Sequence, residues 1–246
     1  MWKSFELCGR YFMLMRKVFS RPDRMSVFWR QLLVETEKLG VTSIGIVAII
    51  SVFIGAVITL QSSLNLSSPF IPKMYVGYMT RETMVLEFSS TMVALILAGK
   101  IGSNIASEIG SMRITEQIDA MEIMGVNSAN YLIFPKIIAA TVFNPFLMLL
   151  SFIVGLFGGW LMVAFTGIIT TSQYIDGLQM DLQPHYITYS MVKMAVFSFI
   201  ITSVSSFFGY FAYGGSLNVG RSSTRAIVAC CVIILIFNLI LTKLLL

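Results

Sequence analysis

The sequence predicts an all-α protein that crosses a membrane several times. Of its 246 residues, 57% are hydrophobic and only 12% are charged, whereas soluble domains carry about 25% charged residues. Apolar runs of about 20 residues, the length that a membrane-spanning helix needs, recur along the chain. The strict alternation typical of outer-membrane strands does not recur. We therefore expect one domain over residues 1–246, with an interfacial segment at 1–40 and a five-span core at 41–246.

The first 40 residues are amphipathic and basic. In residues 2–19, aromatic and methionine side chains gather near one helix face while most lysines and arginines lie elsewhere, a pattern typical of a helix in the membrane interface. Arg21-Pro22-Asp23 breaks this helix, and residues 24–38 form a second amphipathic stretch. We interpret the two stretches as an elbow in the cytoplasmic leaflet. An ordinary basic juxtamembrane segment is the alternative.

Five apolar runs follow, and each is long enough to cross a bilayer. They cover residues 41–62, 82–106, 132–165, 188–212 and 226–246. Pro135 and Pro145 in the third run predict a kink or a break. Gly45 and Gly55 in the first run, and Gly155, Gly158 and Gly159 in the third, permit a neighbouring helix to approach closely.

Basic residues set the expected orientation. Eight of the 17 lysines and arginines precede residue 40, and others gather in segments 100–136 and 213–225, whereas segment 166–187 has none. The N-terminus is therefore expected in the cytoplasm and, after five spans, the C-terminus on the periplasmic side. Membrane orientation and anionic headgroups also explain the net charge of +5. Binding to nucleic acid is not expected.

The stretch from Ala98 to Gly125 is an extended polar segment between long apolar runs. It predicts a short amphipathic helix over residues 115–124, with Thr115 as its N-cap and Gly125 as its stop. The apolar face would carry Ile114, Ile118, Met121 and Met124, and the acidic face Glu116, Asp119 and Glu122. A helix of about 15 Å cannot cross a bilayer. We expect it to lie at the membrane surface and to bind a basic groove on another protein.

The residues argue against catalysis on this chain. The one histidine, His185, falls in an expected external loop, and no metal-ligand spacing is visible in the sequence. No Gly-x-x-x-x-Gly-Lys-Ser/Thr motif occurs, so a nucleotide is not expected on this chain. The three cysteines predict no disulfide framework, and Cys230 and Cys231 are interpreted as packing residues.

Three polar residues inside the expected spans are candidates for a role there. Glu87 is the strongest ionisable candidate, because a charge in hydrocarbon usually faces a cavity or a partner. The alternative is that Glu87 is hydrated near the interface or pairs with a basic residue such as Arg81. Lys193 is expected to extend its ammonium group toward the interface, and Asn238 to form a hydrogen bond between helices.

Residues 108–125, EIGSMRITEQIDAMEIMG, closely resemble the signature of the MlaE-type permeases, the membrane subunits of ABC lipid transporters associated with Mce proteins. The resemblance extends through AGKIGS at 98–103 and YLIFPK at 131–136 to Leu241-Thr242. It implies an ABC permease domain in the bacterial inner membrane that works as a homodimer. It also implies a separate ATPase that carries ATP and Mg²⁺, a periplasmic Mce-domain protein, often hexameric, and in some systems a STAS-domain protein.

The resemblance also implies roles for individual residues. The 115–124 helix is similar to the coupling helix that docks on the ATPase, which implicates Arg113, Glu116, Gln117, Ile118, Asp119, Met121 and Glu122. A lipid cavity between the subunits, lined mainly by the first and last spans, implicates Ile58, Gln61, Leu64 and Leu66, to which we add Glu87.

Two departures from the family pattern stand out. The family's Arg-Glu-Leu-Gly-Pro reads Leu86-Glu87-Phe88-Ser89-Ser90 here, so Glu87 must find another partner. Asn238 stands where the family often has an acid, so a charge pair at that position is absent.

The function that follows is movement of phospholipid or a related lipid between the inner membrane and the Mce partner, driven by the separate ATPase. An ATP-independent carrier or a structural scaffold is the alternative. A carrier is expected to show several intramembrane acids and an inverted repeat, whereas this sequence offers one candidate acid and an odd number of spans. A scaffold has no need of a docking helix.

Overall fold

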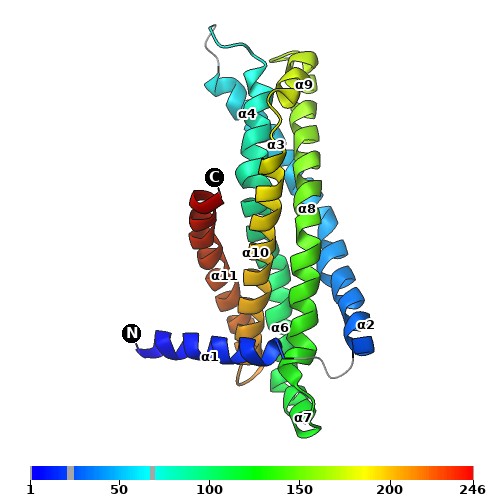
Figure 1. Cartoon of the computed structure of the whole chain (residues 1–246), viewed down its shortest axis with the longest axis vertical. Coiled ribbons are helices and arrows are strands. Elements are labelled where there is room, and N and C mark those ends of the chain that lie inside the picture. The colour runs from blue at the N-terminus through cyan, green and yellow to red at the C-terminus, as the bar shows by residue number, and fades with distance from the viewer. Residues whose placement is uncertain (1, 21–24, 67–69, 246) are drawn as a thin grey trace.

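The computed structural model describes residues 2–20, 25–66 and 70–245. Within these ranges every regular element is a helix, and five helical runs are long and apolar enough to cross a membrane, which confirms the predicted all-α, five-span class. These runs cover Met25–Asn65, Tyr75–Ile114, Ser128–Thr166, Pro184–Tyr210 and Ser216–Leu244. Figure 1 shows them as a long bundle, with a further helix lying across one end.

The first helical run, Met25–Asn65, continues without a break from the second amphipathic stretch (residues 24–38) into the first span (residues 41–62). It joins α2 (Met25–Glu35) to α3 (Ile44–Asn65) through a π-helical turn, η1 (Thr36–Gly40), and a 3₁₀ turn, η2 (Val41–Ser43). The expected boundary at residue 40 is therefore not a break in the helix. The break expected at residues 21–23 lies outside the described residues.

The second run also alternates between two kinds of helix. It comprises α4 (Tyr75–Thr83), the π-helical η3 (Met84–Met92), α5 (Val93–Leu97), the π-helical η4 (Ala98–Gly102) and α6 (Ser103–Ile114). Such π-helical segments are rare and often lie at functional sites. Glu87 falls within η3.

The remaining helices give the bundle two distinct ends. They are α1 (Trp2–Val18), α7 (Gln117–Ile123), α8 (Ser128–Thr166), α9 (Thr171–Gln179), α10 (Pro184–Tyr210) and α11 (Ser216–Leu245). Figure 1 places α1 across one end with α7 projecting beyond it, here called the α7 end, and places α4 and α9 at the opposite, α9 end. Helix α8 runs unbroken through Pro135 and Pro145, so the prolines do not break the third span, and the kink stays a prediction.

Small residues bring α3 and α8 into direct backbone contact. A Cβ atom on Gly55 would lie 1.8 Å from the carbonyl oxygen of Gly155, and one on Gly158 would lie 2.2 Å from that of Val52. The hydroxyl groups of Ser51 and Ser151 share a hydrogen bond of 2.7 Å across the same contact. The predicted close approach is confirmed at Gly55, Gly155 and Gly158, since only a hydrogen atom fits there. It is not borne out at Gly45, where a Cβ atom would meet nothing within 4 Å.

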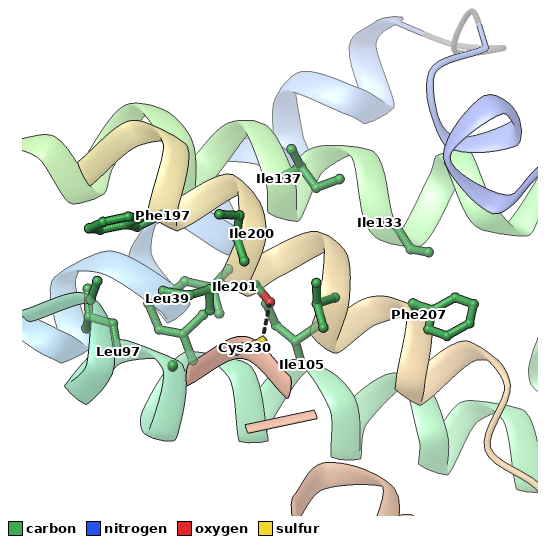
Figure 2. Close-up of a cluster of buried hydrophobic side chains, with 14 of the residues drawn as sticks. Leu39, Leu97, Ile105, Ile133, Ile137, Phe197, Ile200, Ile201, Phe207 and Cys230 are labelled. Carbon is green, nitrogen blue, oxygen red and sulfur yellow. Dashed lines mark hydrogen bonds between the residues drawn. The ribbon is translucent and has the colours of Figure 1, made fainter. Parts of the chain in front are cut away.

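The main hydrophobic core lies toward the α7 end, between α6, α8, α10 and α11. Figure 2 shows it around Ile105, Ile133, Ile201 and Phe207, where the thiol of the fully buried Cys230 donates to the Ile201 carbonyl at 3.7 Å. Cys230 thus acts as a packing residue, as predicted. A smaller apolar cluster under α4 and α9 closes the other end, and it contains Val76, Val163, Ile169 and Tyr174.

Candidate functional site

Helix α7 is a seven-residue helix with a well-defined stop. The Val126 amide donates to the Met121 carbonyl and the Gly125 amide to the Glu122 carbonyl, both at 3.0 Å, while Gly125 has a φ of +79°. This is the Schellman pattern, and it confirms Gly125 as the predicted stop. The prediction of Thr115 as N-cap is wrong, because its hydroxyl donates backward to the Ser111 carbonyl at 2.9 Å. Glu116, in the left-handed region at φ 59°, precedes the helix instead.

The inner side of α7 is fastened to three neighbouring helices. Ile118 is fully buried in the main core, and Met121 packs partly against it. The Arg113 guanidinium of α6 pairs with Asp119 at 2.6 Å. Glu122 accepts hydrogen bonds from the hydroxyl groups of Tyr210 of α10, at 2.8 Å, and Ser128 of α8, at 3.0 Å.

These contacts perturb the Glu122 carboxylate. The hydrogen bond from the Tyr210 hydroxyl is the largest favourable cause that holds the pKa of Glu122 below its ordinary value, although partial burial opposes it. The Ser128 hydroxyl and the charges of Lys17 and Arg113 act in the same direction as Tyr210. Glu122 is therefore ionised at neutral pH and holds α7 to the ends of α8 and α10.

The outer side of α7 faces away from the rest of the chain. Of the seven residues implicated in coupling, Glu116 and Gln117 are exposed and make no side-chain hydrogen bond among the described residues, whereas Ile118 is an internal anchor. Ile123 and Met124 are 86% and 71% exposed, a large apolar area for the tip of a short helix. Sequence reasoning placed Met124 on the apolar face but left Ile123 out, although a bulky apolar residue beside a helix stop was a usable signal.

A second polar site lies inside the bundle, between η3, α10 and α11. The Lys193 ammonium, which is 0% exposed, pairs with the Glu87 carboxylate at 2.9 Å and donates to the Tyr189 hydroxyl at 3.1 Å. Lys193 therefore does not extend to the interface, and that expectation is wrong. Arg81 is not the partner of Glu87 either, since Arg81 pairs with Glu82 at 2.7 Å near α9.

The last span completes this site. The Asn238 amide donates to the Glu87 carboxylate at 3.2 Å, and Thr242 donates to the same group at 3.2 Å. Thr91 of η3 donates to the Asn238 carbonyl oxygen at 3.0 Å. Asn238 thus forms the predicted hydrogen bond between helices. The Glu87 side chain is still 40% exposed, so part of it reaches the outer surface of the chain.

The four other predicted lining residues lie at the end of α3 toward α9. Ile58 is buried within the chain, Gln61 and Leu64 are exposed, and Leu66 packs partly against the smaller cluster. Helix α3 packs mainly on α8, whereas α11 packs mainly on α10 and α6. Figure 1 accordingly shows α3 and α11 on different sides of the bundle.

Five helices that are long and apolar enough to cross a membrane define the class of multi-pass membrane proteins. The family model described as "Permease MlaE" matches residues 32–244. The chain belongs to the MlaE permease family of ABC transporter permeases.

Relatives support this membership along nearly the whole chain. A probable ABC transporter permease protein of Rickettsia bellii is 35% identical over 91% of this chain and 84% of the relative. The protein TRIGALACTOSYLDIACYLGLYCEROL 1, chloroplastic, of Arabidopsis thaliana is 31% identical over 92% of this chain and 65% of the relative. The intermembrane phospholipid transport system permease protein MlaE of Haemophilus influenzae is 28% identical over 97% of this chain and 91% of the relative.

Proposed function

We propose that this chain is the membrane subunit of an ABC transporter that moves phospholipid, or a related lipid, between the bacterial inner membrane and a periplasmic Mce-domain protein. Membership of the MlaE permease family supports the transport class, and the name of the Haemophilus influenzae relative supports the lipid. The observation that carries the coupling is α7, which is fastened on its inner side and exposes Glu116, Gln117, Ile123 and Met124 on its outer side.

The α7 end faces the cytoplasm in this proposal. Helix α1, the end of α6 and the start of α11 meet at that end (Figure 1), and they carry Arg10, Lys17, Arg113, Arg221 and Arg225. Lysine and arginine are enriched on the cytoplasmic side of membrane proteins. The N-terminus is then cytoplasmic and the C-terminus periplasmic, with the Mce partner, a hexamer in related systems, at the α9 end.

A separate ATPase would drive the transport by binding α7. It would carry the ATP and Mg²⁺, and a STAS-domain protein would bind the ATPase rather than this chain. The Arg113–Asp119 pair and the hydroxyl groups around Glu122 connect α7 to α6, α8 and α10. A displacement of α7 would therefore reach the spans as movement of whole helices, because packed helices move as rigid bodies.

The lipid would occupy a chamber between two copies of the chain. Because α3 and α11 pack on different neighbours, a space lined by both is best built from two subunits. The apolar outer faces of these helices suit acyl chains, while Gln61 and the exposed part of Glu87 supply the few polar contacts that orient a headgroup. Ile58 is buried within its own subunit, so it would line the chamber only after α3 moves.

Copurification from mild detergent tests the docking of the ATPase. Glu116→Lys with Met124→Lys alters two exposed positions of α7 and is expected to leave the chain inserted while it loses most of the ATPase, since both changes fall on the bound surface. Glu37→Lys, an exposed charge reversal in η1, is the control and is expected to retain the ATPase. Wild-type amounts of ATPase on the double variant would refute the docking proposal and favour an ATP-independent carrier.

A further inference from the structure

An open cavity of about 330 Å³ lies at the α7 end, between α1 and the ends of the bundle helices. Figure 1 shows α1 crossing the bundle at this level. The lining of the cavity comes from four helices and combines charged with apolar groups. The lining residues are Arg10, Met13, Leu14, Lys17, Arg113, Glu122, Tyr210 and Phe211.

Helix α1 supplies one wall of the cavity. Arg10, Met13, Leu14 and Lys17 follow the i, i+3, i+4, i+7 spacing of one helix face. Two cations therefore stand about 10 Å apart along the helix, with two apolar side chains between them. Met13 is exposed and Leu14 is buried against the core. This wall offers positive charge and apolar surface side by side.

The opposite wall is aromatic and basic. The Arg113 guanidinium lies over the Tyr210 ring, 5.9 Å from its centroid, and the half-exposed Phe211 continues the aromatic surface. Arg113 also pairs with Asp119, and Arg10 pairs with Glu6, one turn earlier in α1, at 2.6 Å. Glu122 is the one carboxylate in the lining, and the hydroxyl groups of Tyr210 and Ser128 already bind it.

The cavity is preformed, because α1 is held in place at two points. The Tyr11 hydroxyl donates to the Ser203 hydroxyl of α10 at 2.9 Å. At the C-terminal end of α1, the Asn130 amide of α8 donates to the Val18 carbonyl at 2.6 Å, and Asn127 donates to the Lys17 carbonyl at 3.1 Å. The cations of α1 are thus presented to the bundle by a fixed helix.

We propose that this cavity binds the headgroup of an anionic phospholipid from the membrane leaflet at the α7 end. Lys17 makes no ion pair among the described residues, and the Arg10 and Arg113 guanidinium groups, each paired with one carboxylate, keep further N–H donors that suit a phosphate group. The exposed Met13 and Phe211 suit the glycerol and first acyl carbons, which a free phosphate ion lacks. The inference rests only on the part of the proposed function that puts this end at a membrane surface, not on the ATPase or on transport. The site lies at the opposite end from Gln61 and Leu64, so it is separate from the proposed chamber.

Native mass spectrometry of the delipidated full-length chain in neutral detergent tests the proposal. Titration with phosphatidylglycerol is expected to show at least tenfold tighter binding than titration with phosphatidylcholine. Arg10→Gln with Lys17→Gln is expected to weaken phosphatidylglycerol binding about 30-fold, since each cation near a membrane surface contributes about fivefold. Lys17→Arg keeps the charge and is expected to bind as the wild type does.

The matched control removes the same charge outside the cavity. Arg16→Gln with Arg30→Gln changes two exposed arginines of α1 and α2 and is expected to keep the preference for phosphatidylglycerol. Equal binding of the two lipids by the wild type, or equal losses in the control and the cavity variants, would overturn the proposal. Displacement of the lipid by water-soluble glycerol phosphate at equal concentration would also overturn it, in favour of a free anion. These outcomes are independent of copurification of the ATPase, so the two proposals can fail separately.

Discussion

Two of the carboxylates that connect helices in this chain, Glu87 between the spans and Glu122 at the α7 end, have different surroundings. Glu87 faces the ammonium of the fully buried Lys193, whereas Glu122 is held by two neutral hydroxyl groups. In hydrocarbon a lone charge is expensive and requires an opposite charge, whereas at the water-exposed end a few hydrogen bonds suffice. Water therefore cannot replace the Glu87–Lys193 ion pair inside the bundle, whereas it can replace the hydrogen bonds to Glu122 at the α7 end.

The same substitution at both carboxylates should show the largest difference. Glu87→Gln leaves the Lys193 ammonium buried without a counter-charge and is expected to lower the free energy of unfolding by about 3–5 kcal/mol. Glu122→Gln is expected to lower it by less than about 1 kcal/mol. Chemical unfolding in detergent measures both values. The double variant Glu87→Gln with Lys193→Met should recover most of the stability lost in Glu87→Gln, because no charge then remains buried. Equal losses of stability in Glu87→Gln and Glu122→Gln would contradict the difference proposed between the two regions.

A methyl group in the interior should have the next largest effect. Gly55→Ala places a Cβ against the Gly155 carbonyl, which must push α3 and α8 apart, so a loss of about 1–3 kcal/mol is expected. Gly45→Ala, in the same helix, meets no atom within 4 Å and serves as the control. Thermal unfolding of the two variants provides the comparison, and indistinguishable melting temperatures would contradict the close packing.

At the α7 end, loss of one hydroxyl group should act locally. Tyr210→Phe removes the hydrogen bond to Glu122 and is expected to cost about 1 kcal/mol of local stability. Amide hydrogen exchange in residues 117–123 should speed up about fivefold, while exchange in the middle of α8 stays unchanged. Faster exchange throughout the bundle would show that the two regions are not separable in this way.

The smallest expected effect is a pH dependence of α7. Because the Tyr210 hydroxyl bonds the ionised form, the pKa of Glu122 is lower in the folded chain than its ordinary value of 4.5. The ionised Glu122 carboxylate therefore stabilises α7 fully above about pH 4.5, and this stabilisation is lost as the pH falls through the pKa of the folded chain. Exchange in residues 117–123 should accelerate over that acidic range, and the Glu122→Gln variant should lack this step. An identical acid profile in the variant would assign the change to another group.

Much of the architecture was predictable from the sequence, because hydrophobic length and small residues act locally. The five apolar runs predicted the five spans, Gly55 and Gly155 predicted a close contact between helices, and Gly125 predicted the end of α7. Each of these signals depends on a residue and its immediate neighbours. The positive φ of Gly125, for example, follows from the absence of a side chain and from its place after a helix.

The partners of the polar residues could not be predicted in the same way. The pairing of Glu87 with Lys193 joins residues 106 positions apart, and periodicity does not say which spans are neighbours. Thr115 failed as an N-cap because a threonine hydroxyl can equally bond a carbonyl of the preceding turn. The joining of α2 to α3 was missed because a π-helical turn absorbs the change from amphipathic to fully apolar sequence without a proline or a break.

The lengths of the helical runs bear on where lipid is handed over. Runs of 39 to 41 residues extend about 60 Å, and the hydrocarbon layer is about 30 Å thick. About 30 Å of each straight run therefore exceeds that layer, and tilt and the interfacial regions, which bring a bilayer to about 40–45 Å, take up part of the excess. In the proposed arrangement, with the α7 end at the inner leaflet, these lengths set the separation between the α7 end and the α9 end, and removing one helical turn from α3, α4 and α8 together would shorten it by about 5.4 Å.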